Sequence, residues 1–181
     1  LAIDRDAIIR GPFYGEAVLN WSAPSVASRP WGEHGVPGPI YDPARANALL
    51  DSLGWLDRDR DGIREDKSGN TIKFQLRTNS DNEVRVAVAN LIQDDLARIG
   101  IACTPSPVEF NTMVANLRQD FQYAAMLSGL GSGVPADPAM YANFLTSSGI
   151  THYWNVRQTR PSTQAEATIE PLYAPLASSI H

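Results

Sequence analysis

The chain has 181 residues, of which 43% are hydrophobic and 19% are charged, and its formal net charge at pH 7 is -5. This composition predicts a soluble globular protein with one sizeable core or two small ones. The 15 basic and 20 acidic side chains form no long block of one sign, so no nucleic acid partner is expected. No apolar run approaches the roughly 20 residues of a membrane span, and no signal peptide is visible. The single cysteine, Cys103, is expected to pack as a small hydrophobe rather than to act as a reactive thiol.

The first residues are apolar at helical spacing, with no capping residue ahead of Leu1. They predict a helix that already runs at Leu1 and ends at Gly11 and Pro12. Residues 12–41 then carry many glycines and prolines, which favours an extended, turn-rich connection over a helix or strand. Such a long connection is usually functional or anchored on a partner surface.

Local signals become clear after Tyr41. Residues 42–53 predict an amphipathic helix that Asp42 caps and Gly54 ends. Its apolar stripe consists of Ala46, Leu49, Leu50 and Leu53. Residues 72–77 alternate between apolar and polar, as in a strand with one buried face. Ser80 and Glu83 have the spacing of a capping box, ahead of a long helix that ends at Gly100.

The next segments complete the predicted sheet. Residues 101–108 predict a second strand, which Pro105 and Pro107 place at a sheet edge. A short helix over 112–117 and a fully covered strand over 123–127 follow, and residues 158–181 predict a C-terminal helical segment. The alternation of strands and helices predicts an α/β fold with a mixed, partly parallel sheet flanked by helices. We expect residues 1–181 to form a single lobe.

The stretch DRDRDGIREDKSG, residues 57–69, resembles a calcium loop. Asp57, Asp59, Asp61 and Gly62 match positions 1, 3, 5 and 6 of an EF-hand loop. Position 12, however, is Ser68 in place of glutamate, and a strand follows in place of a helix. Two interpretations therefore stay open. The three aspartates either form a polar turn by binding nearby backbone amides, or hold an adventitious Ca²⁺ weakly.

The sequence lacks the common motifs of catalytic sites. The histidines at 34, 152 and 181 have no zinc-ligand spacing, and no GxSxG nucleophile elbow is present. The segment LSGLGSGVPADP, residues 127–138, lacks the GK[ST] of a phosphate loop. We expect no enzyme and no required cofactor. The glycines of this segment predict a loop whose bare backbone lets something approach closely.

Several stretches in order resemble the peptide and nickel class of substrate-binding proteins of ABC importers, family 5 of the extracellular solute-binding proteins. The matching stretches are AIDRDAII with the following YGEA, YDPARANALLDSLGW with DRDRDGIRED, NEVRVAVANLIQDDLARIGI, and FQYAAMLSGLGSGVPADPAMYANFLTSSG. Together they cover roughly residues 1–157. The resemblance implies a two-lobed clamp, which closes on a solute, delivers it to a permease and catalyses nothing.

The resemblance implies a periplasmic-binding-protein-like lobe. The chain looks like the second lobe, without the first lobe and without the return segment that completes it. The implied function is the substrate-binding component of an ABC transporter, which captures a peptide-like or other small polar solute between its lobes. The implied partners are that solute, the permease subunits and the missing first lobe, and the implied location is periplasmic or attached to the cell surface. The alternative is a calcium-dependent structural or interaction module that uses the DxDxDG loop.

The resemblance also implies where the solute binds. Ligands of α/β sheets lie beyond the carboxyl ends of the strands, and in the family the loop after the buried strand faces the cleft. Peptide-binding members usually carry an aspartate in this loop, where this chain has Gly133 or a neighbour, so a neutral or weakly polar solute is expected. Tyr14 and Trp31 either add stacking surface or pack, and Asn143 either orients the ligand or caps a turn. The expected contacts are Leu130, Gly131, Ser132, Gly133, Val134, Tyr14, Trp31 and Asn143.

Overall fold

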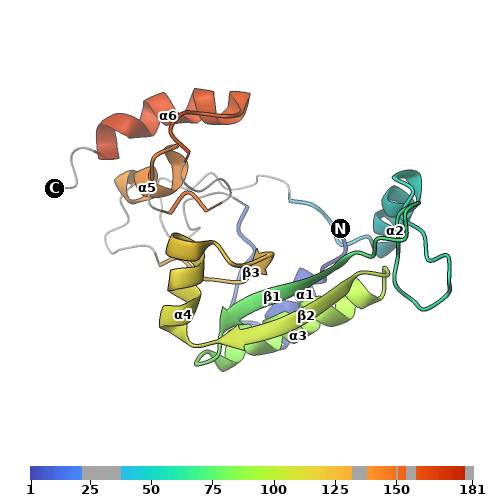
Figure 1. Ribbon diagram of the computed structural model, residues 1–181. Helices are drawn as coiled ribbons and strands as arrows, with labels where there is room; N and C mark the ends of the chain where they lie inside the picture. Colours follow the sequence, from blue (N-terminus) through green and yellow to red (C-terminus); the bar gives the residue numbers. More distant parts are fainter. Residues whose placement is uncertain (22–37, 132–137, 150, 154–157, 178–181) are drawn as a thin grey trace. The chain divides into compact units, whose positions relative to one another are not determined.

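The computed structural model describes residues 1–21, 38–131, 138–149, 151–153 and 158–177 (Figure 1). The chain divides into two compact units, the first made of residues 1–19 and 38–129 and the second of residues 20–37 and 130–181. That the two units form one lobe stays a prediction. The described residues of the predicted connection, 12–21 and 38–41, contain turns and irregular backbone but no helix or strand.

The first unit is built on a parallel sheet. It contains β1 (Lys73–Asn79), β2 (Ala102–Val108) and β3 (Ala125–Met126), in the order β2-β1-β3. Leu76 of β1 is in register with Pro105 of β2 and with Ala125 of β3. The prolines of β2 therefore lie on an edge strand, where a missing N–H is tolerated. The α/β class is confirmed, and the pairings between these three strands are all parallel.

Helix α3 (Glu83–Ala97) covers one face of the sheet, and Figure 1 shows it running along β1 and β2. The core between them consists of Leu76, Ala89 and Cys103. Partly buried apolar side chains surround it, namely Phe74, Ile92, Leu96, Ala125 and Leu127. Cys103 is 3% exposed, so its predicted packing role is confirmed, and burial raises the pKa of its thiol.

The N-terminus of α3 differs from the prediction. Asn82, and not Ser80, caps the helix, because its side chain accepts a hydrogen bond from the Arg85 N–H at 2.9 Å. The Ser80 N–H instead donates to the Val108 carbonyl at 2.7 Å. The predicted capping box was therefore wrong, because Ser80 directly follows β1 and its N–H is bound to the last residue of β2. Gly100 follows the helix with φ +77°, as a C-terminal glycine should.

Helix α1 (Arg5–Arg10) also differs from the prediction, because it begins only at Arg5. The Asp4 carboxylate accepts the Ala7 N–H at 2.8 Å and caps the helix. The predicted uncapped helix from Leu1 was therefore wrong. The Asp4 N–H donates to the buried Asp95 carboxylate of α3 at 2.8 Å, which ties α1 to α3.

Helix α2 (Pro43–Ser52) begins at its predicted cap, since the Asp42 carboxylate accepts the Arg45 N–H at 2.8 Å. Its predicted apolar stripe is only partly buried. Ala46 is 8% exposed, whereas Leu49 and Leu53 are 48% and 73% exposed. Polar contacts to the Arg64 side chain hold this helix. Arg64 Nη1 lies 2.5 Å from Asp51 Oδ1, and Nη2 donates to Asn47 Oδ1 at 2.7 Å.

The remaining helix of the first unit is α4 (Phe110–Ala115), which continues as the π-helical turn η1 (Asn116–Asp120). Glu109 caps α4 by accepting the Thr112 N–H at 3.0 Å. Phe121 then adopts a left-handed conformation with φ +56°, and the chain turns towards β3. A short helix was predicted here. The strand predicted over 123–127 is present in its middle, but Ala125 and Met126 are only half-buried, short of the full cover that was predicted.

The described part of the second unit is helical. It contains η2 (Pro138–Tyr141), α5 (Ala142–Leu145) and α6 (Gln164–Ala177), which lies within the predicted C-terminal helical segment. Thr163 and Glu166 form a capping box at the start of α6, because each side chain accepts the other residue's backbone N–H, at 3.0 and 3.2 Å. Oε1 of the same glutamate lies 3.5 Å from Nε2 of His152, which is 1% exposed. Among the described residues, no helix is long and apolar enough to cross a membrane.

Candidate functional site

The carboxyl edge of the sheet in the first unit is the candidate site that the structure describes best. β1 ends there with Thr78 and Asn79, which are 0% and 4% exposed. Thr78 Oγ1 donates to the Leu127 carbonyl at 3.0 Å, and the Leu127 N–H donates to the Arg77 carbonyl at 2.8 Å. These two bonds fix the backbone that leaves β3 beside the end of β1, so the glycine-containing loop starts from a rigid position.

Arg85 lies at the same edge. It belongs to the first turn of α3, which begins shortly after β1 ends, and its Nη1 donates to Asn79 Oδ1 at 2.6 Å. A Cβ atom added to Gly129 would come within 2.5 Å of Arg85 Nη2. The absence of a side chain at Gly129 therefore lets the guanidinium lie directly against the backbone of the loop. Sequence reasoning missed Arg85, because no signal in the linear sequence links residues 79, 85 and 129.

The predicted contact residues in the loop are only partly described. Leu130 is 59% exposed, and a side chain added to Gly131 would meet no atom of the described residues within 4 Å. Ser132, Gly133 and Val134 lie outside the described residues. Leu130 and Gly131 thus have the open surroundings that a contact surface needs, but their role in binding stays a prediction.

The other predicted contacts lie on separate segments. Tyr14, in the first unit, is 87% exposed and has φ +51°, and Trp31 lies outside the described residues. Asn143, in α5 of the second unit, has an exposed side chain, while its carbonyl accepts the Thr151 N–H at 3.2 Å. Their joint contribution to one site stays a prediction.

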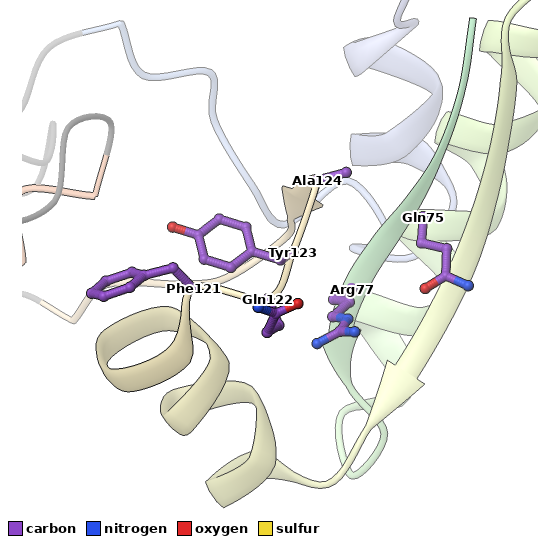
Figure 2. A pocket seen from close by; sticks show the side chains of 6 residues that line it. All are labelled: Gln75, Arg77, Phe121, Gln122, Tyr123 and Ala124. Carbon is purple, nitrogen blue, oxygen red and sulfur yellow. The ribbon is translucent and has the colours of Figure 1, made fainter. Parts of the chain in front are cut away.

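A pocket of about 380 Å³ lies on the face of the sheet opposite α3. The residues of β1 that line it alternate with those that pack against α3, and successive side chains of a strand point to opposite faces. Figure 2 shows its lining, which consists of Gln75, Arg77, Phe121, Gln122, Tyr123 and Ala124. Arg77 Nη1 donates to Asn116 Oδ1 of η1. The lining offers a guanidinium, two amides and aromatic rings, which can hold a small polar group. Sequence reasoning assigned Gln75 and Arg77 only to the polar side of a strand and missed this pocket.

The acidic loop brings its three aspartates together. Carboxylate oxygens of Asp57, Asp59 and Asp61 lie within 4.8 Å of one another, and all three side chains are exposed. Each carboxylate also accepts a backbone N–H of the loop. The distances are 3.1 Å for Gly62 to Asp57, 3.2 Å for Asp61 to Asp59 and 2.7 Å for Ile63 to Asp61. These bonds are those of a polar turn, and the geometry also permits a weak cation site, so both interpretations stay predictions.

The carboxylate of Asp66 organises the second half of the loop. It accepts the N–H groups of Ser68 and Asn70 at 2.7 and 2.9 Å and the Asn70 side-chain amide at 2.8 Å. The side-chain hydrogen bond from Asn70, followed by the backbone bonds, lowers the pKa of Asp66 below its ordinary value. Leu56, Glu65 and Thr71 form antiparallel bridges around this turn. The loop is therefore a compact structure in its own right.

The family described as "Bacterial extracellular solute-binding proteins, family 5 Middle" matches residues 1–152. A "Probable ABC transporter-binding protein" of Deinococcus radiodurans is 26% identical over 94% of this chain and 30% of its own length. "Oligopeptide-binding protein AppA" of Bacillus subtilis is 29% identical over 84% of this chain and 28% of its own length. The chain thus spans less than a third of these two relatives.

The solved structure of AppA from Bacillus subtilis, in complex with a nonapeptide, superposes with a TM-score of 0.78. The match covers 96% of this chain and 34% of AppA, at 23% identity, and it shows that the fold is shared. The family match covers most of the chain and extends through the acidic loop, the sheet and the loop after β3. The chain belongs to the family 5 bacterial extracellular solute-binding proteins.

Proposed function

We propose that the chain is part of the substrate-binding component of an ABC importer. The match of residues 1–152 to the family of extracellular solute-binding proteins is the observation that carries this proposal. The relatives named as an ABC transporter-binding protein and an oligopeptide-binding protein support the same role. The protein would capture a peptide-like or other small polar solute and deliver it to the membrane permease, without catalysing a reaction.

The chain would supply one of the two lobes that close on the solute. Its partners would be the solute, the permease subunits and the other lobe of the same receptor. The carboxyl edge of the sheet, with the loop that starts at Gly129, would face the solute, since ligands of α/β sheets bind beyond the strand ends. The protein would work outside the cytoplasmic membrane, in the periplasm or attached to the cell surface.

A thermal-shift screen of the complete receptor tests this proposal. The panel contains di- to pentapeptides, oligosaccharides and metal chelates, because a ligand that binds only the folded state raises the melting temperature. We expect a rise with one of these classes and an unchanged compound after prolonged incubation. Chemical turnover of the bound compound, or the absence of a shift with every class, would contradict the proposed function.

A further inference from the structure

We propose that Arg85 is a solute-binding residue that selects solutes carrying a carboxylate. This inference rests on the function proposed above and names the chemical class of the solute. Arg85 lies in the first turn of α3, and its guanidinium reaches the end of β1 through Asn79. It therefore lies at the edge of the sheet where the solute is expected.

The guanidinium of Arg85 is hydrogen-bonded to a neutral side chain. Nη1 donates to the amide oxygen of Asn79 at 2.6 Å, and the amide nitrogen of Asn79 donates to Asp81 Oδ1 at 2.5 Å. Asp81 is thus bound through the amide and forms no ion pair with the guanidinium. In the part of the chain that the structure describes, the ion pairs within 4 Å involve Arg64, Arg98 and His152. The charge of Arg85 is therefore available to an incoming anion.

The shape of the guanidinium suits a carboxylate. Arginine offers five N–H donors in a planar fork that matches the two oxygens of a carboxylate. Among the described residues, the bond to Asn79 is the contact that fixes this fork, and Asn79 itself is 4% exposed and cannot move freely. Arg85 is half-buried. A fixed and partly desolvated guanidinium binds an anion more strongly than a mobile side chain in water does.

Gly129 places this charge beside the loop. A methyl group at Gly129 would lie 2.5 Å from Arg85 Nη2, so the guanidinium occupies the space that a side chain would fill. The neutral residues of the loop predict a weakly polar solute. Because Arg85 is positively charged, we expect this solute also to carry one acidic group. The expected solute is an organic molecule with a carboxylate that reaches Arg85.

The test uses matched pairs of probes with the complete receptor. One pair is a pool of N-acetylated tri- to pentapeptides with a free carboxyl terminus and the same pool as C-terminal amides. The other is a neutral oligosaccharide and its uronate-terminated counterpart. Affinity is measured by calorimetry for the wild type, Arg85→Gln, Arg85→Lys and Gly129→Ala. Arg45→Gln is the control, because this exposed arginine of α2 removes the same charge away from the sheet edge.

We expect the acidic member of one pair to bind more tightly than its neutral partner. Arg85→Gln should weaken the acidic member roughly 10- to 100-fold, as for the loss of a charged hydrogen bond, and leave the neutral partner almost unchanged. Arg85→Lys should retain part of the affinity, Gly129→Ala should weaken the acidic member by displacing the guanidinium, and Arg45→Gln should change neither. Melting temperatures establish that each variant is folded.

The outcomes separate this inference from the proposed function. Equal binding of the acidic and the neutral member in every pair that binds, or an equal loss of both members in Arg85→Gln, overturns the role of Arg85 and leaves solute capture intact. The same holds if the receptor binds only a metal chelate without a free carboxylate. A receptor that binds no probe and no compound of the wider screen overturns the proposed function, and with it this inference.

Discussion

Gly100 lies directly against the side chain of Arg64. A Cβ atom at Gly100 would come within 2.6 Å of Arg64 Cγ, and the glycine has φ +77°. The Gly100 carbonyl also accepts the Arg64 N–H at 2.8 Å. The end of α3 and the acidic loop are thus joined at a place where both the backbone conformation and the available space require glycine.

Gly100→Ala should therefore destabilise the first unit more than the left-handed backbone alone predicts. Gly69→Ala is the matched control, because Gly69 has φ +81° with no atom within 4 Å of the added methyl group. Gly69→Ala should cost about 1 kcal/mol for the left-handed conformation. Gly100→Ala should cost about 1 to 3 kcal/mol more, because the stem of Arg64 must shift. Urea unfolding measures both, and equal losses would show that Arg64 adjusts freely.

Among the cationic residues of the acidic loop, Arg64 should be the one whose replacement destabilises the protein most. Its side chain is 12% exposed and donates to the Ile99 and Trp55 carbonyls at 2.8 and 2.7 Å, besides its contacts to Asn47 and Asp51. Arg64→Met should lower the free energy of unfolding by about 2 to 4 kcal/mol, since three partly buried acceptors lose their donor.

Arg58→Met provides the comparison for this prediction. Arg58 is exposed and donates to the carbonyls of Gly54 and Asp66 at 3.0 and 3.4 Å. Its replacement should cost less than about 1 kcal/mol, because exposed polar contacts contribute little. Urea titration of the two variants compares their free energies of unfolding. A larger loss of this free energy in Arg58→Met than in Arg64→Met would contradict the central role of Arg64.

Local signals in the sequence correctly predicted the start of α2 and the end of α3, which depend only on neighbouring residues. Asp42 caps α2 and Gly100 follows α3, because capping depends only on residues within one turn. Ser80 failed as a cap because its N–H binds Val108, which is distant in the sequence. The apolar stripe of α2 was identified, but periodicity does not say what covers it, and Leu53 is 73% exposed.

The candidate site was harder to predict than the fold. The glycines after β3 correctly marked a place of close approach, since the Arg85 guanidinium lies against Gly129. The identity of that neighbour depends on the parallel pairing of β1 and β3, which brings residues 79 and 129 to one edge. The pocket over Gln75 and Arg77 likewise depends on the position of the segment before β3. Neither juxtaposition has a signature in the linear sequence.

The stability of the acidic loop should depend on the ionisation of Asp66. Hydrogen bonds from Asn70 and Ser68 lower the pKa of Asp66 below its ordinary value of 3.8. Because the folded pKa is lower than the unfolded one, this contribution is fully present above the unfolded pKa and is lost as the pH falls through the folded pKa. Asp66→Asn should therefore lower the melting temperature at pH 6.

The same difference should shrink as the pH falls below about 3.8. Melting temperatures of the wild type and Asp66→Asn, measured between pH 2.5 and pH 7, give the two curves. They should converge at the acidic end, where the wild-type carboxyl group also becomes neutral. A difference that stays constant over this range would show that the hydrogen bonds of Asp66 do not depend on its charge.

The DxDxDG loop should keep its fold without calcium. The three carboxylates each accept a backbone N–H, so the turn has its own hydrogen bonds, and the EF-hand glutamate at position 12 is replaced by Ser68. A chelator should therefore leave the melting temperature unchanged, and millimolar Ca²⁺ should raise it only slightly. Asp59→Asn should respond in the same way as the wild type. If calcium organises the loop, the chelator lowers the melting temperature substantially by mass action, and Asp59→Asn abolishes that response.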